Sequence, residues 1–557
     1  MQSSATLLGA TAASGLLPAI ARAQTTTAGA APAASANKST IVGSDQTAIV
    51  ETVSGKVRGY IRNGIYTYKG IPYGETTEGA ARFMPPSKAK PWTGLRSSMQ
   101  YGKVSPQGPR AGWNNDEEAW MFSWDDGIQG EDCLRVNIWT PAINDHKKRP
   151  VMVWLHGGGY VAGSGQELRS YDGERLSRRG DVVVVSLNHR LGPFGFLNLA
   201  SYGEKYASSA NVGMLDIVAA LEWVRDNISN FGGDPGNVTI FGQSGGGGKV
   251  GTLMAMPFAQ GLFHRAIVQS GSILKAGTQE KSAKLTSAVL EELNLSASQL
   301  DQLQTMPPQK LIEAGSAAMK KLNPPGPFSW KNVADRLGWG PVVDGKDLPT
   351  HPFDPAAPTV SANVPLMVGT VLNEFMTALN HPEFENMTAD EARKRVQEIY
   401  ADKSDHIMEV FRAAHPKAKT FDIVSLIMTA PIRQSAITQA ERKAAQNAAP
   451  AFVYWFQWKT PVLDGRPRAF HCSELSFCFD NTDRCENMTG GGDEPRALAA
   501  KVSEAWIHFA RTGNPNHSEL PHWPAFTAEN CPTMIFDTQC KMQNNPDKEE
   551  RLAIENA

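Results

Sequence analysis

Short, almost uninterrupted apolar segments recur in the first half of the chain. They cover residues 136–140, 151–155 and 181–187, and turn residues bound the first two. A strand with one face in water alternates apolar and polar residues, whereas a strand covered on both faces does not. These segments therefore predict buried strands, as in a parallel sheet with helices on both faces.

The segment from Asn211 to Asn230 has the periodicity of a helix. Apolar residues recur at helical spacing, as at Leu215, Val218 and Leu221, and an apolar strand-like run at 238–241 follows. Helical spacing of this kind marks an amphipathic helix. Strand, helix and strand in alternation predict a large, mostly parallel α/β sheet.

Other segments extend this pattern. Residues 49–73 contain short β-type runs broken by glycines, which predicts an antiparallel N-terminal ribbon. Residues 279–319 and 390–446 have helical patterns, and between them Pro-rich loops flank a short apolar run at 365–368. We expect helical insertions in an α/β domain.

Composition excludes several classes of protein. Of 557 residues, 41% are hydrophobic and 20% charged, so most of the chain is not disordered. Lys plus Arg number 54 against 56 Asp plus Glu, a net charge of -2 that gives no general attraction to nucleic acid or anionic lipid. No apolar run reaches the ~18 residues of a membrane span.

A prior of roughly 150 residues per domain suggests several domains, but large α/β enzymes exceed it, and we expect one domain over 46–557.

The N-terminal segment is a candidate export signal. Residues 7–21 are rich in Ala and Leu, and Ala21-Arg22-Ala23 matches the small-residue pattern at which signals are cleaved. We therefore interpret 1–23 as an export signal and 24–45 as a disordered linker, which predicts a secreted or periplasmic protein. No Lys or Arg precedes the apolar stretch. The alternative is an Ala-rich leader on a cytoplasmic protein.

Six cysteines are few for this length, and none forms the C-x-x-C pair typical of zinc sites. Five lie late in the chain, where an oxidising compartment would allow local disulfides. Spacing does not decide the pairing; we favour Cys531 with Cys540 and one bridge within Cys472, Cys478 and Cys485. The alternative is that all of them are small buried apolar residues.

The strongest chemical signal is the G-x-S-x-G sequence from Gly242 to Gly246, placed after a predicted strand and before a predicted helix. A nucleophile elbow turns so sharply that side chains two residues before or after its serine would collide with backbone. Glycine at both positions removes them. Ser244 is therefore the candidate nucleophile.

A phosphate-binding loop is the competing interpretation of the same stretch, because it ends in Lys249. A Walker motif has four residues between its first Gly and the Gly-Lys pair and then a hydroxyl residue. Here five residues intervene, and Val250 follows the lysine. We therefore reject it.

A second signal is the run of three glycines after the strand-like segment 151–155. Such a turn lets backbone N–H groups point into a cavity, where a tetrahedral intermediate needs donors for its oxyanion. One donor is typically worth ~3–4 kcal/mol. We assign the oxyanion hole to the N–H groups of Gly158, Gly159 and Gly245.

These motifs together resemble the type-B carboxylesterases, which include cholinesterases and bacterial para-nitrobenzyl esterases and have the α/β-hydrolase fold. The resemblance runs from about residue 49 to residue 537 and keeps the family's order of motifs. The matching stretches are residues 68–73 (YKGIPY), 131–134 (EDCL), 156–159 (HGGG), 188–192 (NHRLG), 231–235 (FGGDP) and the elbow.

The resemblance implies a Ser, Glu, His triad in that chain order. Glu374, in a loop after an apolar run, matches the family's acid, and His471 opens its H-x-x-E-L stretch. Phe375 stands where the family usually has Gly. Asp344 and Asp347 are alternative carboxylates, although both fit turn positions better.

The implied mechanism is ester hydrolysis through an acyl-enzyme. An imidazole titrates near neutral pH, so His471 suits the role of base, and Glu374 would orient it. Ser244 would attack the ester carbonyl, and water would then release the acyl group. This chemistry requires neither a metal nor an organic cofactor, and the partner is a small-molecule ester.

The sequence also departs from the family pattern at two positions of the elbow and at one position where the family often has a cysteine. Gln243 replaces the usual Glu, and Gly245 the usual Ala. The family often pairs the Cys of E-D-C-L with an upstream Cys, but Ser105 occupies that stretch. We therefore expect Cys133 to be unpaired.

The leading hypothesis is a serine carboxylesterase for small to medium apolar or aromatic esters. Aromatic residues near the expected gorge suit such groups; they are Trp113, Trp120, Phe122 and Trp124. Alternatives are a specialised hydrolase of toxin or plasticiser esters or amides, or a non-catalytic adhesion-type relative. The presence of all three triad residues argues against the last, and the sequence leaves monomer and homodimer open.

Overall fold

The computed structural model describes residues 40–108, 116–323 and 337–556 of the chain. The predicted export signal and Trp113 lie outside these ranges. The predicted linker, 24–45, overlaps them at its end, and there the prediction was wrong. Ile41 and Val42 form strand β1, which pairs with β4.

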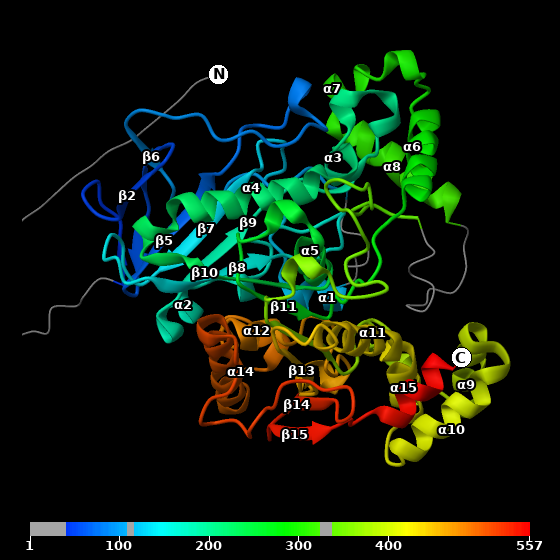
Figure 1. Ribbon diagram of the computed structural model, residues 1–557. Coiled ribbons are helices and arrows are strands. Elements are labelled where there is room, and N and C mark those ends of the chain that lie inside the picture. The colour runs from blue at the N-terminus through cyan, green and yellow to red at the C-terminus, as the bar shows by residue number, and fades with distance from the viewer. Residues whose placement is uncertain (1–39, 109–115, 324–336, 557) are drawn as a thin grey trace, which may run out of the picture. The chain divides into compact units, whose positions relative to one another are not determined.

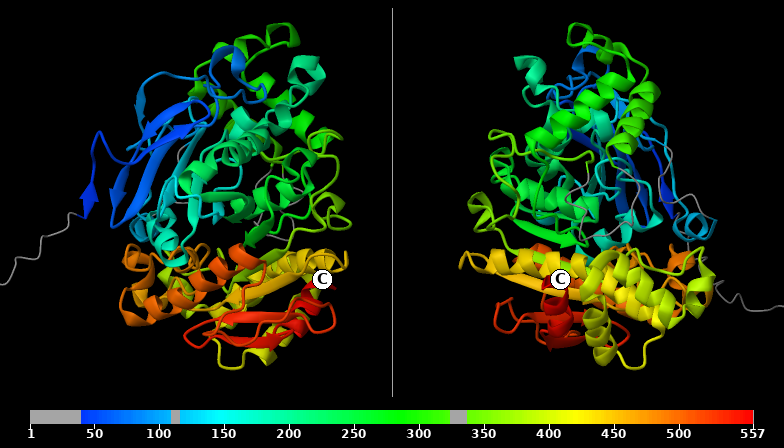
Figure 2. Two further views of the ribbon diagram at one scale, coloured as in Figure 1. Left: turned by 60° about the vertical axis from the view of Figure 1, so that its left-hand side comes forward. Right: turned by 90° about the vertical axis from the view of Figure 1, so that its right-hand side faces the viewer.

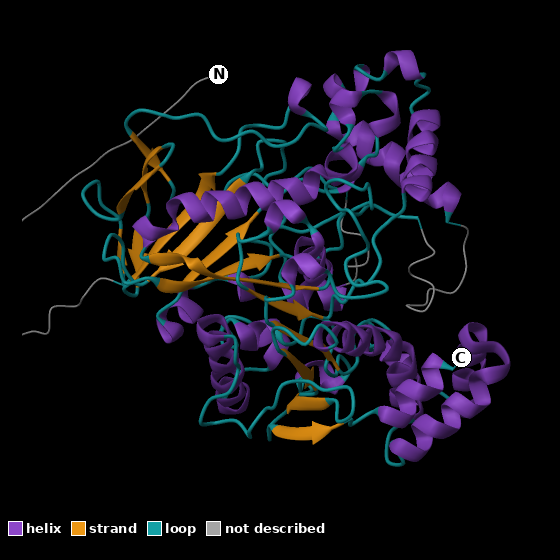
Figure 3. Ribbon diagram, in the orientation of Figure 1, coloured by secondary structure: helices purple, strands orange, loops and turns teal. Residues whose placement is uncertain are grey.

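A twelve-stranded sheet runs through the described residues (Figure 1, Figure 3). Its order is β1-β4-β5-β7-β9-β8-β10-β11-β12-β13-β14-β15. The pairs from β9 through β14 are parallel, and those toward both edges are antiparallel. The strands are β1 Ile41–Val42, β4 Tyr60–Arg62, β5 Ile65–Pro72, β7 Arg135–Thr140, β8 Arg149–Leu155, β9 Val183–Leu187, β10 Gly233–Gln243, β11 Arg265–Gln269, β12 Leu366–Val371, β13 Ala451–Phe456, β14 Pro532–Phe536 and β15 Lys541–Asn544.

A second, three-stranded sheet contains β2, β3 and β6. Strands β2 and β3 are the antiparallel ribbon that the N-terminal sequence predicts, and β6 joins β3 in parallel. The mostly parallel sheet is confirmed, but β7, one of the apolar runs, pairs antiparallel with β9. The strands are β2 Ile49–Thr52, β3 Gly55–Arg58 and β6 Leu95–Ser97.

Alternate residues of the central strands face opposite layers of helices. On β8, Val151, Val153 and Leu155 pack in one core with residues of α4 and α5. Met152 and Trp154 pack in a second core with residues of α2 and α14. Every residue of β8 is buried, which explains why its sequence shows no alternation.

The helices agree with the predicted helical segments. Residues 211–230 contain α4, residues 279–319 lie largely in α6, α7 and α8, and residues 390–446 lie largely in α9, α10 and α11. Figure 1 shows α4 lying across the strands. The helices are α1 Asp116–Phe122, α2 Glu174–Gly180, α3 Gly192–Phe196, α4 Val212–Asn227, α5 Gly245–Ala255, α6 Gln279–Glu292, α7 Gln302–Thr305, α8 Pro308–Leu322, α9 Ala389–Tyr400, α10 Ser404–Ala414, α11 Thr420–Ala444, α12 Leu475–Cys478, α13 Glu486–Thr489, α14 Asp493–Thr512 and α15 Lys548–Glu555.

Helices α9, α10, α11 and α15 enclose a third hydrophobic core of their own. Figure 2 shows this group beside the C-terminal strands. A capping box starts α9, in which Thr388 and Glu391 satisfy each other's backbone N–H groups. Within the described ranges, no helix is long and apolar enough to cross a membrane.

All six cysteines are free, which contradicts the predicted disulfides. In the β14–β15 hairpin, Asn545 N–H donates to Cys531 O, so Cys531 faces Asn545 rather than Cys540. At a strand rise of about 3.3 Å per residue, the two cysteines are roughly 15 Å apart, well beyond disulfide reach. Cys133 is unpaired and buried, as expected.

The three clustered cysteines are buried at separate places. Cys472 Sγ donates to Gln243 Oε1 at 3.2 Å, and Cys478 Sγ accepts from Gln269 Nε2 at 3.6 Å. Cys485 lines a cavity beside α13. Burial raises the pKa of all three thiols, so they behave as small apolar residues.

Candidate active site

Ser244 is the single residue between the end of β10 and the start of α5. Its φ of 57° and ψ of -126° lie in a region that L-residues rarely adopt. A Cβ atom at Gly242 would lie 2.5 Å from Gly246 C, and one at Gly246 would collide with Leu155 O. The strained elbow that the G-x-S-x-G spacing predicts is therefore present, and it needs both outer glycines.

The three-glycine turn follows β8 and lies against the elbow. Gly158 and Gly159 have φ values of 79° and 63°, which glycine adopts without cost. A Cβ atom at Gly245 would lie 2.5 Å from Gly159 N. The backbones of Gly158, Gly159 and Gly245, the residues predicted to form the oxyanion hole, therefore lie close together.

Glu374 and His471 come from loops that follow β12 and β13. Glu374 Oε2 lies 2.5 Å from His471 Nδ1, and both side chains are buried. His471 N–H also donates to Glu374 O at 2.8 Å, so backbone as well as side chain joins the two loops. Because a carboxylate on Nδ1 fixes the imidazole's tautomer, Nε2 is left to act as an acceptor.

The opposite ring nitrogen of His471 meets Gln243, the residue before Ser244. Gln243 Nε2 is 3.0 Å from His471 Nε2. The hydrogen bonds of the described residues include none between Ser244 Oγ and His471. The structure thus brings the carboxylate and the imidazole together at the elbow, with the Gln243 amide on the nitrogen that a serine hydroxyl would use.

Phe375 lies over the imidazole. Its ring centroid is 3.8 Å from that of His471, with 30° between the planes, and Phe375 is 43% exposed. The Phe375 ring therefore covers the buried imidazole and remains exposed beside the elbow. The sequence marked Phe375 only as a departure from the family's Gly.

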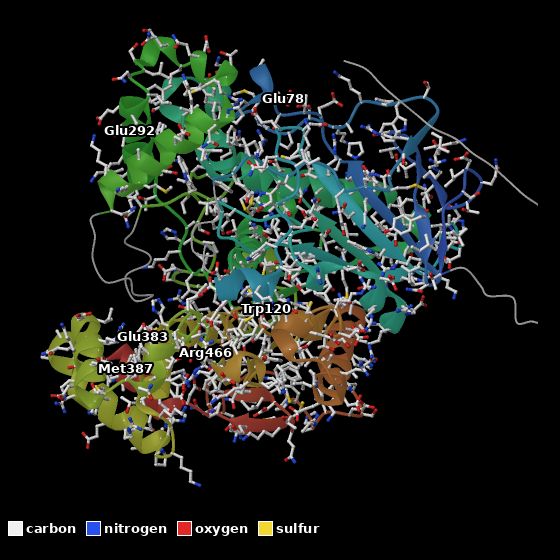
Figure 4. The ribbon with its side chains drawn as sticks, turned by 180° about the vertical axis from the view of Figure 1, so that it is seen from behind. Glu78, Trp120, Glu292, Glu383, Met387 and Arg466 are labelled. Carbon is white, nitrogen blue, oxygen red and sulfur yellow. The ribbon has the colours of Figure 1, made fainter. Side chains whose placement is uncertain are left out.

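The predicted gorge aromatics have different positions. Phe122 is buried and packs edge-on against Phe470, the residue before His471. Trp120 is exposed on α1, and Figure 4 labels it together with Arg466. The ion pair of Glu117 with Arg466, at 2.5 Å, ties α1 to the loop that leads to His471. Phe122 therefore supports that loop.

Glu474 is a second buried carboxyl group that sequence reasoning did not assign to the site. Its Oε1 accepts from Gln269 Nε2 at 3.2 Å, and its Oε2 has no hydrogen-bond partner among the described residues. Burial, together with repulsion from Glu374, raises the pKa of Glu474 to about 8. Glu474 is therefore protonated at neutral pH. Its place in H-x-x-E-L was the available signal.

Asp344 and Asp347, the alternative candidates for the acid, have other surroundings. Asp344 Oδ1 accepts from the N–H groups of Lys346 and Leu348, as a turn residue does. Asp347 is buried, and burial raises its pKa. Among residues 40–108, 116–323 and 337–556, no group of three or more His, Cys, Asp or Glu side chains could hold a metal ion.

Comparison with known proteins gives the family of this chain. The model of the family described as Carboxylesterase family matches residues 46–554. The chain belongs to the carboxylesterase family. It is 36% identical to the para-nitrobenzyl esterase of Bacillus subtilis over 91% of this chain and 98% of that protein.

Two further carboxylesterase relatives extend the comparison. The phenmedipham hydrolase of Pseudarthrobacter oxydans is 32% identical, over 87% of this chain and 94% of that protein. An esterase from Clostridium hathewayi that can hydrolyze aliphatic aromatic polyesters superposes with a TM-score of 0.79 and 35% identity, covering 92% of this chain and 99% of that one. The fold is therefore the α/β-hydrolase fold, and the chain is a carboxylic ester hydrolase.

We expect Glu474 to make stability depend on pH. The unfolded carboxyl group releases its proton near pH 4.5, whereas the folded one keeps it until about pH 8. Stability therefore falls as pH rises through this window, because only the unfolded state loses the proton there. Glu474→Gln, which mimics the protonated group, should gain stability relative to the parent between pH 5 and pH 8. Urea midpoints at the two pH values measure this, and a parallel dependence in both proteins would contradict it.

Proposed function

We propose that this carboxylesterase acts through Ser244 as nucleophile, His471 as general base and Glu374 as the carboxylate that orients the base. The observation that carries the proposal is the 2.5 Å contact of His471 Nδ1 with Glu374 beside the strained Ser244. A serine on such an elbow is presented to a cleft, and a carboxylate on Nδ1 directs the basic lone pair of the other nitrogen outward.

In the proposed acylation step, His471 Nε2 removes the Ser244 proton as Oγ attacks the ester carbonyl carbon. The N–H groups of Gly158, Gly159 and Gly245 bind the negative oxygen. His471 then gives the proton to the alcohol as its bond to carbon breaks, and water repeats the sequence on the acyl-enzyme. No step uses a metal or an organic cofactor.

For the attack, Ser244 Oγ must replace the Gln243 amide as the hydrogen-bond partner of His471 Nε2. Catalytic hydrogen bonds commonly tighten only when substrate is bound. Gln243 keeps a second partner in Cys472, whose thiol donates to Oε1. We propose that the Gln243 amide moves off Nε2 as the substrate enters.

The substrates we propose are small to medium apolar or aromatic esters. Exposed apolar side chains are the supporting observation, since Val161, Ile273 and Phe375 are each more than one-third exposed although they flank the elbow or its neighbouring turns. Exposed apolar groups around a site favour apolar ligands. The relatives that act on phenmedipham and on polyesters support the alternative of a specialised ester or amide hydrolase.

Replacing Ser244 tests the nucleophile. Ser244→Ala should lower the turnover of a short-chain nitrophenyl ester by at least ~10³-fold, because the acyl-enzyme is no longer formed. A fluorophosphonate should add its mass to the parent protein but not to this variant.

The matched control is Ser503→Ala on α14, where the hydroxyl donates to Ala499 O in the core. This variant should keep both turnover and labelling. Undiminished turnover in Ser244→Ala would eliminate the proposed mechanism.

Phe375 should set the preference for aromatic esters. Phe375→Gly should lower kcat/KM for a nitrophenyl benzoate by about three- to tenfold more than for the acetate, since an aromatic pair is worth about 0.5–1.5 kcal/mol. Phe375→Leu, which keeps apolar bulk without a ring, should give an intermediate ratio. Equal losses on both esters would show that the ring does not contact the substrate's aromatic group.

We further propose export of the protein, supported by the apolar segment 7–21 and the Ala21-Arg22-Ala23 pattern. A secreted or periplasmic location follows. Expression in a host with a general secretory pathway should yield mature protein whose first residue, by N-terminal sequencing, is Gln24. Retention of Met1 on active protein confined to the cytoplasm would contradict export.

A further inference from the structure

Lys249 is a buried cationic side chain that the proposed mechanism does not use. It lies on α5, near the elbow, and its relative exposure is 0%. Its Nζ donates to His156 O at 2.9 Å. The lysine that gives the elbow its likeness to a phosphate loop therefore points at a backbone carbonyl beneath the three-glycine turn.

The groups around Lys249 offer it little compensation. No ion pair of the described residues includes Lys249, and Glu167 attracts it only from a distance. His156 and His189 stack with centroids 5.1 Å apart, and burial together with the Lys249 charge holds their pKa values well below the usual range. The titratable or charged groups that face Lys249 are His156, Tyr160, Glu167, His189 and, beyond His189, Arg190.

The His156 carbonyl, which accepts the hydrogen bond of Lys249, lies directly before the three-glycine turn, here also called the oxyanion turn. The carbonyl of His156 belongs to the peptide unit that also contains Gly157 N–H, and Gly158 and Gly159 follow directly. Glycines offer many backbone conformations, so their N–H groups point at one spot only if the turn is anchored. A donor to the His156 carbonyl holds the turn at its first residue, and any charge on that donor adds a positive field behind the amides.

We propose that Lys249 is a positioning residue that anchors the oxyanion turn through the His156 carbonyl and, when charged, stabilises the negative oxygen of the transition state. This inference rests on the proposed function. It explains why a cation is kept where an apolar residue of similar volume would be easier to bury. Lys249 does not touch the substrate.

The inference gives the reaction a particular pH dependence. Burial lowers the pKa of Lys249 to about 7, with Glu167 acting in the opposite direction. The ammonium is present below that pH and is lost as the pH rises through it. The rate should therefore decline as the pH rises through that range.

Lys249→Met tests the anchor, because Met has similar length but neither a donor nor a charge. We expect kcat for a nitrophenyl ester to fall by about tenfold, less than the 10²–10³ for a direct oxyanion donor, with KM within about twofold. The alkaline decline should disappear. The melting temperature should stay or rise, since an uncompensated buried amine is removed.

Lys443→Met is the matched control. Lys443 is equally buried, on α11, and donates to Ser361 O and Ala362 O, away from the elbow. This variant should keep the kcat and the alkaline decline of the parent. Loss of that decline in Lys443→Met would assign it to buried lysines in general and overturn the inference.

Lys249→Gln separates the hydrogen bond from the charge and serves if the Met variant does not fold. It should lose the alkaline decline but keep more kcat than Lys249→Met. An unchanged pH profile in either folded Lys249 variant would overturn the inference while leaving the triad intact. Undiminished turnover in Ser244→Ala would instead overturn the proposed function, so the two failures are distinguishable.

Discussion

The close approach of two backbones, at the start of α5 and the end of β8, is the constraint on which the site depends. Gly246 lies against Leu155 O, and Gly245 against Gly159, with no room for a Cβ atom at either contact. This approach forces Ser244 into its strained conformation and brings the elbow to the glycine turn. The parallel strands position the loops of Glu374 and His471, because their carboxyl ends lie at one edge of the sheet, where α/β proteins carry their sites.

Much of this arrangement could be predicted from the sequence, because glycine patterns and apolar runs report local constraints. The elbow and the glycine turn were predicted from motifs, and the pairing of Glu374 with His471 was implied by the resemblance to the type-B carboxylesterases. The disulfides were not, since the β14–β15 register sets Cys531 opposite Asn545. Likewise, Ile41 and Val42 form a strand only because β4 offers an edge to pair with.

The sequence contains signals for Gln243, Phe375 and Glu474, but the roles of these residues depend on contacts and burial that no local pattern reports. Gln243 occupies His471 Nε2, and Phe375 covers the ring, through contacts between segments far apart in the chain. Glu474 is kept protonated by an apolar setting and by a carboxylate neighbour. The site thus combines a carboxylate that contacts the imidazole with a second, protonated carboxyl group, a division that only the folded chain creates.

The helices with a separate core, α9, α10, α11 and α15, reach the loop of Glu374 through α11. Asn373 donates to Ser425 at 2.9 Å, and Thr429 donates to Leu372 O at 3.3 Å. A small shift of α11 would therefore be passed to Glu374, the carboxylate that contacts His471. Under the proposed mechanism, a substitution in α11 would therefore change turnover without altering a residue that contacts the substrate.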